Sequence, residues 1–294
     1  MLYGALEAGG TKMVCAIGDE KGTIIERRTY PTTTPEETMP LLLSFFRQHP
    51  IKALGIGCFG PVDLNKNSTT YGYITSTPKL SWQNYNICGA FYEALHIPIG
   101  FNTDVNGSCL GEMTFGAAKG LRSVAYITVG TGVGVGICID GKPLHGMMHA
   151  EAGHMLVKRY PGDTFVGACP FHGDCIEGLC AGGSIEQRLG KKAFLLEEND
   201  PVWTYTGYYI SQLIVNLILT VSPQRVILGG GVMKQKQLFP IIREQVPKLL
   251  NGYVKTKELA DIKQYIVEAE CGDDQGVLGA LLLGYEAYKS SVMN

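Results

Sequence analysis

The chain has 294 residues, of which 45% are hydrophobic and 18% charged, and this balance excludes a disordered chain. Lys and Arg together number 25 and Asp and Glu 27, so the formal net charge of −2 gives neither a basic footprint for nucleic acid nor a polybasic run for a membrane surface. The strongest apolar stretch, LIVNLILTV at 213–221, is far shorter than the roughly 20 residues that a membrane span needs.

The cysteines and the N-terminus indicate the compartment. Nine cysteines are an odd number, and most stand singly inside apolar runs, where we expect buried thiols rather than a disulfide framework: Cys15, Cys58, Cys88, Cys109 and Cys138. The opening MLYGALEAGGTK has neither the basic region nor the long apolar core of a signal peptide. We therefore expect a cytoplasmic protein.

The first part of the chain alternates strands, glycine turns and helices. The apolar runs 2–8, 13–18 and 23–30 are predicted strands, and the turn Gly9-Gly10-Thr11-Lys12 separates the first two. The following segments are predicted helices at 36–48, 85–96 and 104–118, and strands at 51–58 and 97–101.

The same pattern returns later. Predicted strands at 124–129 and 135–140 flank the turn 130–134, GTGVG, and both glycine turns place a Thr directly after a Gly. We interpret this as an internal duplication of one fold unit, and the alternative is a chance similarity between two glycine-rich hairpins. The remaining segments are predicted helices at 183–195, 202–221, 236–251 and 275–289, and strands at 225–228 and 264–268.

Strands that alternate with helices predict α/β layers with a mostly parallel sheet, to which the two hairpins add antiparallel strands. We expect two such halves with a cleft between them. The first is a small N-terminal α/β domain, 1–118, completed by the C-terminal helix 275–294. The second is a larger α/β domain, 119–274.

The glycine turns are candidate phosphate sites, because glycine exposes backbone N–H groups and the Thr hydroxyl adds a donor. Neither turn is a P-loop, and a hairpin follows 130–136 where a dinucleotide site requires a helix. Taken singly, either turn is more often a plain hairpin, and Gly229-Gly230-Gly231 is more often a tight turn than a site for adenine or ribose. As a pair in a duplicated chain the two turns favour phosphate binding, with these candidates: Gly10, Thr11, Thr131, Gly132 and Lys12, whose side chain could equally point to solvent. Gly230 and Gly231 are candidates for contact with adenine or ribose.

An acid follows the strand in IPIGFNTDVNG, 97–107. Asp104 there lies at the carboxyl end of a strand, where α/β proteins bind ligands, and its carboxylate could accept the proton of a substrate hydroxyl as that hydroxyl attacks phosphorus. The alternative is that Asp104 only caps the next helix. Glu7 ends the first strand and is a candidate for holding Mg²⁺, directly or through water.

A second cluster is typical of a metal site. Cys169, His172 and Cys175 lie within seven residues, and with His154 they form the Cys₂His₂ set of structural zinc. A Cys169–Cys175 disulfide is the rival interpretation. The zinc would fix the loop that carries Glu151 and Glu177, whose carboxylates suit sugar hydroxyls, although Glu177 could be an ordinary solvated charge. His145 and His149 receive no role.

Several motifs together resemble one family: EAGGTK at 7–12, NTDVNG at 102–107, the segment 127–154, CPFHGDC at 169–175 and GGGV at 229–232. Over its whole length the chain resembles the ROK family (repressor, open reading frame, kinase) of sugar kinases, and within it the bacterial fructokinases. The resemblance implies the duplicated actin/hexokinase-like, ribonuclease H-like fold and phosphorylation of a hexose by Mg-ATP, with Asp104 as the base. It also implies Gly183 and Val232 in the nucleotide pocket, His154 beside the sugar, and a homodimer.

Three departures from the wider family bear on the sugar. Glucokinase-like members have Asp at the position of Glu7, Asn at that of Thr103, and Cys at that of His172. Because that Asn contacts the sugar, Thr103 is a candidate sugar contact and fructose is the expected substrate, with fructose 6-phosphate as product. The alternatives are a mannokinase, a glucokinase or another hexose kinase. A sugar-sensing regulator is a further rival, but the first strand begins at Leu2 and leaves no room for a DNA-binding helix-turn-helix.

Overall fold

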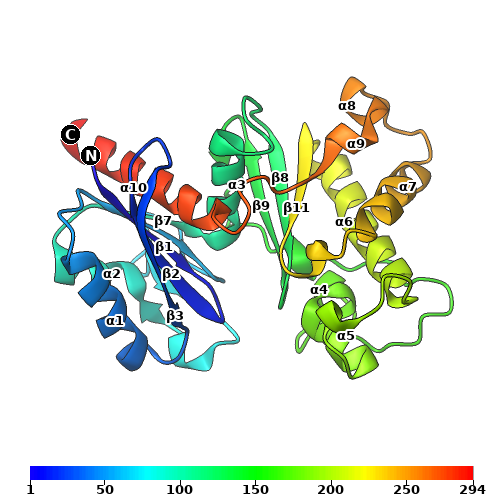
Figure 1. Ribbon diagram of the computed structural model, residues 1–294, viewed down its shortest axis with the longest axis horizontal. Helices are drawn as coiled ribbons and strands as arrows, with labels where there is room; N and C mark the ends of the chain where they lie inside the picture. The colour runs from blue at the N-terminus through cyan, green and yellow to red at the C-terminus, as the bar shows by residue number, and fades with distance from the viewer. Residues whose placement is uncertain (294) are drawn as a thin grey trace. The chain divides into compact units, whose positions relative to one another are not determined.

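The computed structural model describes residues 1–293. The chain forms two compact units, each built on a mixed sheet (Figure 1). The first unit comprises Met1–Gly120, Lys142–Ala150 and the residues from Glu270 onward, and the second comprises Leu121–Gly141 and Glu151–Ala269. The short segment Lys142–Ala150 therefore belongs with the first unit although the second unit flanks it in the sequence.

The sheet of the first unit has the strand order β3-β2-β1-β4-β7. Its strands are β1 (Tyr3–Ala8), β2 (Lys12–Gly18), β3 (Ile24–Pro31), β4 (Leu54–Cys58) and β7 (Ile99–Thr103). The hairpin strands are antiparallel, whereas β1, β4 and β7 are parallel. Short strands also occur in this unit: β5 (Tyr73–Ile74), β6 (Tyr85–Asn86) and β10 (Lys142–Pro143).

Alternation along β1 and β2 gives this sheet two buried faces. One face carries Leu6 and Met13 into a core beneath the helices α1 (Pro35–Arg47) and α2 (Ile87–Leu95). The other carries Tyr3 and Ala5 against α10 (Gln275–Met293), which also packs on α3 (Asp104–Phe115). Glu7 is two residues beyond Ala5 and so lies on the α10 face.

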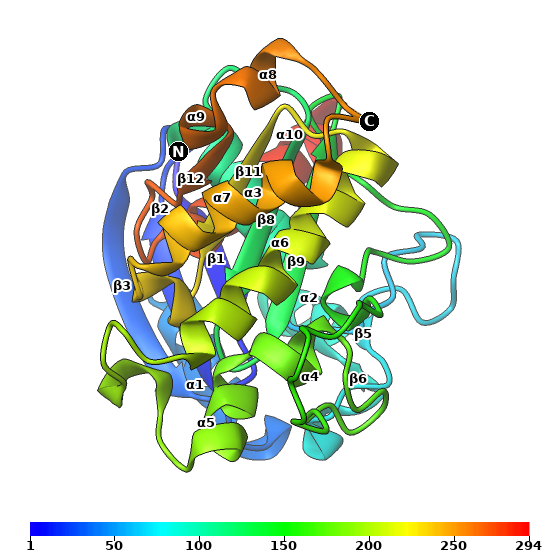
Figure 2. The same ribbon diagram turned by 90° about the vertical axis from the view of Figure 1, so that its right-hand side faces the viewer.

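The sheet of the second unit repeats this topology, as the duplication predicts. Its strands are β8 (Val124–Val129), β9 (Val133–Ile139), β11 (Arg225–Gly229) and β12 (Ile266–Glu268). An antiparallel β8–β9 hairpin is followed by two strands that extend the sheet in parallel, in the order β9-β8-β11-β12. The helices α6 (Val202–Val221) and α7 (Leu238–Leu250) pack together over one face (Figure 2).

The other helices of the second unit are short: α4 (Ile176–Cys180), α5 (Gly182–Leu189), α8 (Lys257–Ala260) and α9 (Ile262–Tyr265). No helix within residues 1–293 has both the length and the apolar character to cross a membrane. All five cysteines expected to be buried thiols are buried, and none of them forms a disulfide.

Proline and glycine explain two of the predicted boundaries that are wrong. The predicted strand 97–101 is displaced to Ile99–Thr103, because Pro98 lacks the N–H that a strand start donates. The predicted helix 183–195 ends at Leu189, since Gly190 adopts a left-handed conformation with φ of 68°. The predicted strand 51–58 begins only at Leu54, three residues after Ile51. The predictions missed α4, α8 and α9.

Glycines set the contact between α3 and α10. A Cβ on Gly279 would lie 1.7 Å from the Gly107 carbonyl oxygen, whereas a Cβ on Gly107 would meet the Gly276 carbonyl oxygen at an ordinary 3.7 Å. The backbones of the two helices therefore touch at Gly279, and α10 cannot accept a side chain there without moving.

We expect Gly279→Ala to lower the free energy of unfolding by about 3 kcal/mol, because overpacking a rigid backbone contact forces the helices apart. Gly107→Ala is the matched control on the facing helix, and its better helix propensity should leave stability unchanged or slightly higher. Urea unfolding of both variants measures the difference. Equal stabilities would contradict the packing argument.

Candidate active site and metal centre

Asp104 is the first residue of α3 and directly follows β7. The N-cap of that helix is Thr103, whose hydroxyl oxygen accepts the Asn106 N–H at 3.1 Å. Gly57 on the neighbouring strand lets the backbone of Asp104 approach, since a Cβ there would lie 3.3 Å from the Asp104 Cα. The Asp104 carboxylate is therefore not needed as the helix cap.

The first unit brings Asp104 and Glu7 close enough to interact electrostatically. Burial raises the pKa of Asp104 to about 6, and a hydrogen bond from the Val105 N–H at 2.8 Å limits the rise. Burial and then the Asp104 charge raise the pKa of Glu7 to about 7, against the opposing charges of Lys12 and Arg27. Of two such carboxylates, one can accept a proton and the other can bind a divalent cation.

Glu7 also depends on α10. A Cβ on Gly276, in the first turn of that helix, would lie 2.4 Å from the Glu7 carboxyl carbon. The absence of a side chain at Gly276 thus lets the carboxylate rest against the helix N-terminus, where the helix dipole favours negative charge. Glu7, the candidate for Mg²⁺, and Asp104, the candidate base, therefore lie in the same unit.

The first glycine turn is a tight β1–β2 connection. The Gly9 N–H donates to the Lys12 carbonyl at 3.0 Å, and the Thr32 hydroxyl donates to the Gly9 carbonyl at 2.7 Å. The side chains of Thr11 and Lys12 are exposed at the tip. The turn is thus fixed by backbone contacts and presents its predicted phosphate-binding groups outward.

In the second unit three glycine segments meet. The Gly182 N–H donates to the Gly130 carbonyl at 2.7 Å, and a Cβ on Gly182 would lie 3.6 Å from Val232. Gly231 is exposed, and nothing lies within 4 Å of where its Cβ would be. Thr131 and Gly183 line a cavity of about 280 Å³ together with Glu177. The segments that carry the nucleotide candidates of this unit are therefore brought together. They include Val232, whose side chain is buried.

Glu177 connects this turn to the predicted metal site. One carboxylate oxygen accepts the Val133 N–H at 3.0 Å, and the other lies 4.0 Å from His154 Nε2. A Cβ on Gly132 would lie 2.5 Å from the Glu177 carboxylate, so a side chain at this position would displace that carboxylate. Glu177 is therefore not an ordinary solvated charge. No feature of the sequence indicates the hydrogen bond between Glu177 and Val133.

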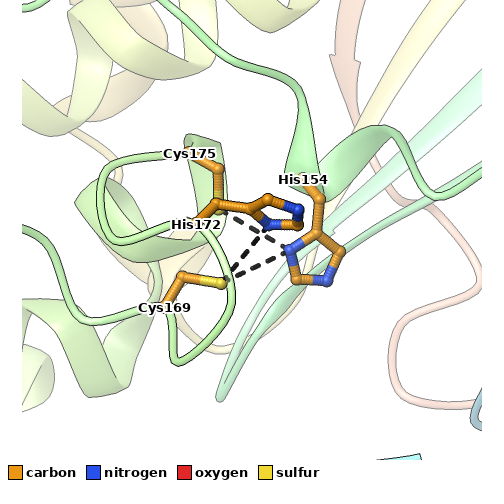
Figure 3. Close-up of side chains that lie close together, drawn as sticks. All are labelled: His154, Cys169, His172 and Cys175. Carbon is orange, nitrogen blue, oxygen red and sulfur yellow. Dashed lines mark hydrogen bonds between the residues drawn. The ribbon is translucent and has the colours of Figure 1, made fainter. Parts of the chain in front are cut away.

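The four predicted zinc ligands converge (Figure 3). Their ligand atoms lie within 4.8 Å of one another, and the Nδ1 of His154 is 3.6 Å from the Sγ of both Cys169 and Cys175. Cys169 Sγ lies 3.7 Å from His172 Nδ1. Tetrahedral zinc with ordinary Zn–S and Zn–N bonds separates sulfur and nitrogen ligands by about 3.6 Å. The set fits structural zinc, and both cysteines are free thiols rather than a disulfide.

A buried ion pair anchors the loop that carries these ligands. Arg188 on α5 makes two hydrogen bonds to the Asp163 carboxylate, at 2.5 and 2.9 Å, and Tyr209 on α6 donates a third at 2.6 Å. Burial acts to raise the pKa of Asp163, but these hydrogen bonds outweigh it and hold the pKa at about 2. Asp163, which precedes the ligands Cys169, His172 and Cys175 in the chain, is thereby bound to helices α5 and α6.

The other predicted sugar contacts lie in different environments. Thr103 is 3% exposed and is occupied as a helix cap, although its hydroxyl proton remains a donor. Glu151 is exposed and precedes the short turn that carries His154. Sequence reasoning gave no role to His145 and His149, which the structure places in the first unit, His145 beside Asn102.

Comparisons with known proteins settle the family. A model described as the ROK family matches residues 3–286. The chain belongs to the ROK family. A fructokinase from Pediococcus pentosaceus is 45% identical over 99% of this chain and 100% of its own length, and one from Lactococcus lactis is 43% identical over 97% and 98%. The crystal structure of a ROK hexokinase from Thermus thermophilus matches with a TM-score of 0.80 and 26% identity, covering 99% and 100% of the two chains.

Metal analysis tests the zinc site. We expect about one zinc per chain in the purified ROK protein, and a large loss of zinc in Cys175→Ser because three ligands rarely retain a structural ion. Cys180→Ala is the matched control, since Cys180 is buried five residues away and its thiol donates only to a backbone carbonyl. Full zinc content in Cys175→Ser, measured by mass spectrometry, would contradict the assignment.

Proposed function

We propose that this ROK protein is a fructokinase that transfers the γ-phosphoryl group of ATP to the 6-hydroxyl of D-fructose. The observation that carries the proposal is the full-length identity of 43–45% to the two fructokinases. The site chemistry supports it, because a phosphoryl transfer needs a poised carboxylate, phosphate-binding backbone and a cation. The first unit supplies Asp104 and Glu7, and each unit supplies a glycine turn.

In the proposed reaction the sugar oxygen forms a bond to the γ-phosphorus while the bond to the β,γ-bridging oxygen breaks and ADP leaves. Asp104 accepts the hydroxyl proton, as a general base within the first unit. The raised pKa of Asp104, about 6, keeps the carboxylate ionised at neutral pH while strengthening it as a base. Mg²⁺ arrives with ATP, and Glu7 would hold it directly or through water, neutralising phosphate charge.

We assign ATP contacts to backbone and hydroxyl groups of the turns: Gly10, Thr11, Lys12, Thr131, Gly132, Gly183, Gly230, Gly231 and Val232. Sugar contacts are assigned to Thr103, Glu151 and Glu177. His154 can serve both functions, since its Nδ1 faces the zinc ligands and its Nε2 remains for the sugar or for Glu177. A homodimer remains a prediction.

A panel of hexoses tests the substrate. We expect the kcat/KM of ADP release to be highest for fructose among fructose, mannose, glucose, N-acetylglucosamine and N-acetylmannosamine, each with Mg-ATP. A lead for mannose or glucose would retain the kinase and overturn the sugar assignment. No turnover with any sugar by folded, zinc-loaded protein would overturn the proposed function.

The Asp104→Asn variant tests the base. We expect kcat to fall by about two to four orders of magnitude, because the amide cannot accept the proton. Fructose binding should persist. Asp140→Asn is the control, since Asp140 is an exposed turn residue with φ of 51°, a conformation that Asn also adopts. Turnover near the wild-type level in Asp104→Asn would overturn the mechanism.

The pH profile gives an independent check on Asp104. Only the ionised carboxylate accepts a proton, so kcat should fall about tenfold per pH unit below a pH of about 6 and level off above it. An acid limb near pH 4, the range of an unperturbed carboxyl group, would show that burial does not raise the pKa of this group in the working enzyme.

A further inference from the structure

We propose that His145 binds the sugar directly and helps to select it, as a hydrogen-bond acceptor beside Asp104. This inference rests on the proposed function, because it assigns a further contact to the same sugar site. Its evidence comes from the first unit alone: the position of segment 142–150, the hydrogen bonds of Asn102, and the contrast between His145 and His149.

Segment 142–150 is held against the first unit by His149. The Nε2 of His149 accepts the Val62 N–H at 3.0 Å, and its side chain is 4% exposed. Within the segment the backbones of His145 and His149 form an antiparallel bridge, and the Gly146 N–H donates to the Met148 carbonyl at 3.0 Å. The segment is therefore a closed loop with a buried anchor, and this fixes the position of His145.

His145 contacts the strand end that leads into Asp104. Its Nε2 lies 3.3 Å from the Oδ1 of Asn102, which is 5% exposed and two residues before Asp104. The same Oδ1 accepts the Thr103 N–H at 2.9 Å and the Asn106 side-chain amide at 2.8 Å. A backbone N–H can only donate, so this oxygen must be the acceptor and the Nε2 of His145 must carry the hydrogen.

That tautomer leaves the Nδ1 of His145 as a hydrogen-bond acceptor. Partial desolvation at the Asn102 side lowers the pKa of His145, so the ring is neutral at neutral pH and the lone pair is available. The side chain is exposed, and within residues 1–293 Nδ1 makes no hydrogen bond. A neutral imidazole with one nitrogen fixed and the other open is suited to accept a hydroxyl proton of a neighbouring polyol.

His149 shows what a purely structural histidine looks like in the same loop. It is buried, its Nε2 accepts from Val62, and its Nδ1 lies 3.4 Å from the Ala150 carbonyl. Both of its nitrogens face protein groups, whereas only one nitrogen of His145 does. The loop thus uses one histidine as the anchor and leaves the other with an open nitrogen. Because His145 contacts Asn102, two residues before Asp104, a sugar whose reacting hydroxyl reaches Asp104 is the ligand that this nitrogen would meet.

His145→Ala provides the first test. We expect the KM for fructose to rise about tenfold or more, with kcat, the KM for ATP and the melting temperature nearly unchanged, since one hydrogen bond to the sugar is lost. Met147→Ala is the matched control, because Met147 is in the same loop and 95% exposed. If His145 only supported Asn102, the loss would appear in kcat and in the acid limb of the pH profile instead, and that result would overturn the inference.

Deoxy sugars identify the contact itself. We expect one of 1-deoxy-, 3-deoxy- and 4-deoxyfructose to lose about tenfold in kcat/KM with the wild-type enzyme and to lose nothing further with His145→Ala, because both changes remove the same hydrogen bond. If every deoxy sugar loses the same factor in kcat/KM with the wild-type enzyme and with His145→Ala, the inference about His145 is overturned and the proposed function stands. A wild-type enzyme that does not phosphorylate fructose would overturn the proposed function, and the inference with it.

Discussion

The close approach of helix backbones to strands in the first unit is the constraint on which the candidate site depends. A Cβ on Gly55 of β4 would lie 1.7 Å from the Ala280 carbonyl oxygen, and one on Gly279 would lie as close to the Gly107 carbonyl oxygen. Helix α10 is therefore pressed against both the sheet and α3. Its first turn then reaches Glu7, and the start of α3 holds Asp104 beside the same sheet edge. Packing of small residues thus determines where two carboxylates meet.

In the second unit the corresponding constraint is the metal site. Zinc bound to Nδ1 of His154 would leave Nε2 of that ring directed toward Glu177, and Glu177 in turn accepts the N–H of Val133 in the glycine turn. A metal ligand, a carboxylate and a predicted phosphate-binding turn are therefore linked by successive contacts. Structural zinc in this position would do more than close a loop, because the histidine that it holds lies beside the Glu177 carboxylate that accepts the Val133 N–H.

Local signals made part of this predictable from sequence. The cysteine and histidine spacing at 169–175 indicated zinc, the predicted strand 124–129 and helix 202–221 match β8 and α6, and the repeated glycine turns indicated the duplication. Contacts between distant residues gave no such signal. Nothing in the spacing of His149 and Val62 indicates that they form a hydrogen bond, so the sequence does not predict that segment 142–150 belongs to the first unit. Boundary errors arose where Pro98 or Gly190 overrode the hydrophobic pattern.

The difference between local signals and distant contacts also explains why residue type alone could not assign roles to the histidines or the acids. A buried carboxylate can be a cap, a ligand or a base, and Asp104 is separated from the first role only because Thr103 already caps α3. Burial pushes the pKa of Asp104 upward, and the Val105 N–H restrains it, so the group stays an anion at neutral pH yet holds a proton more tightly than a solvated aspartate. A base for a sugar hydroxyl needs both properties, and they arise from the same strand-to-helix turn that Asn102 connects to His145.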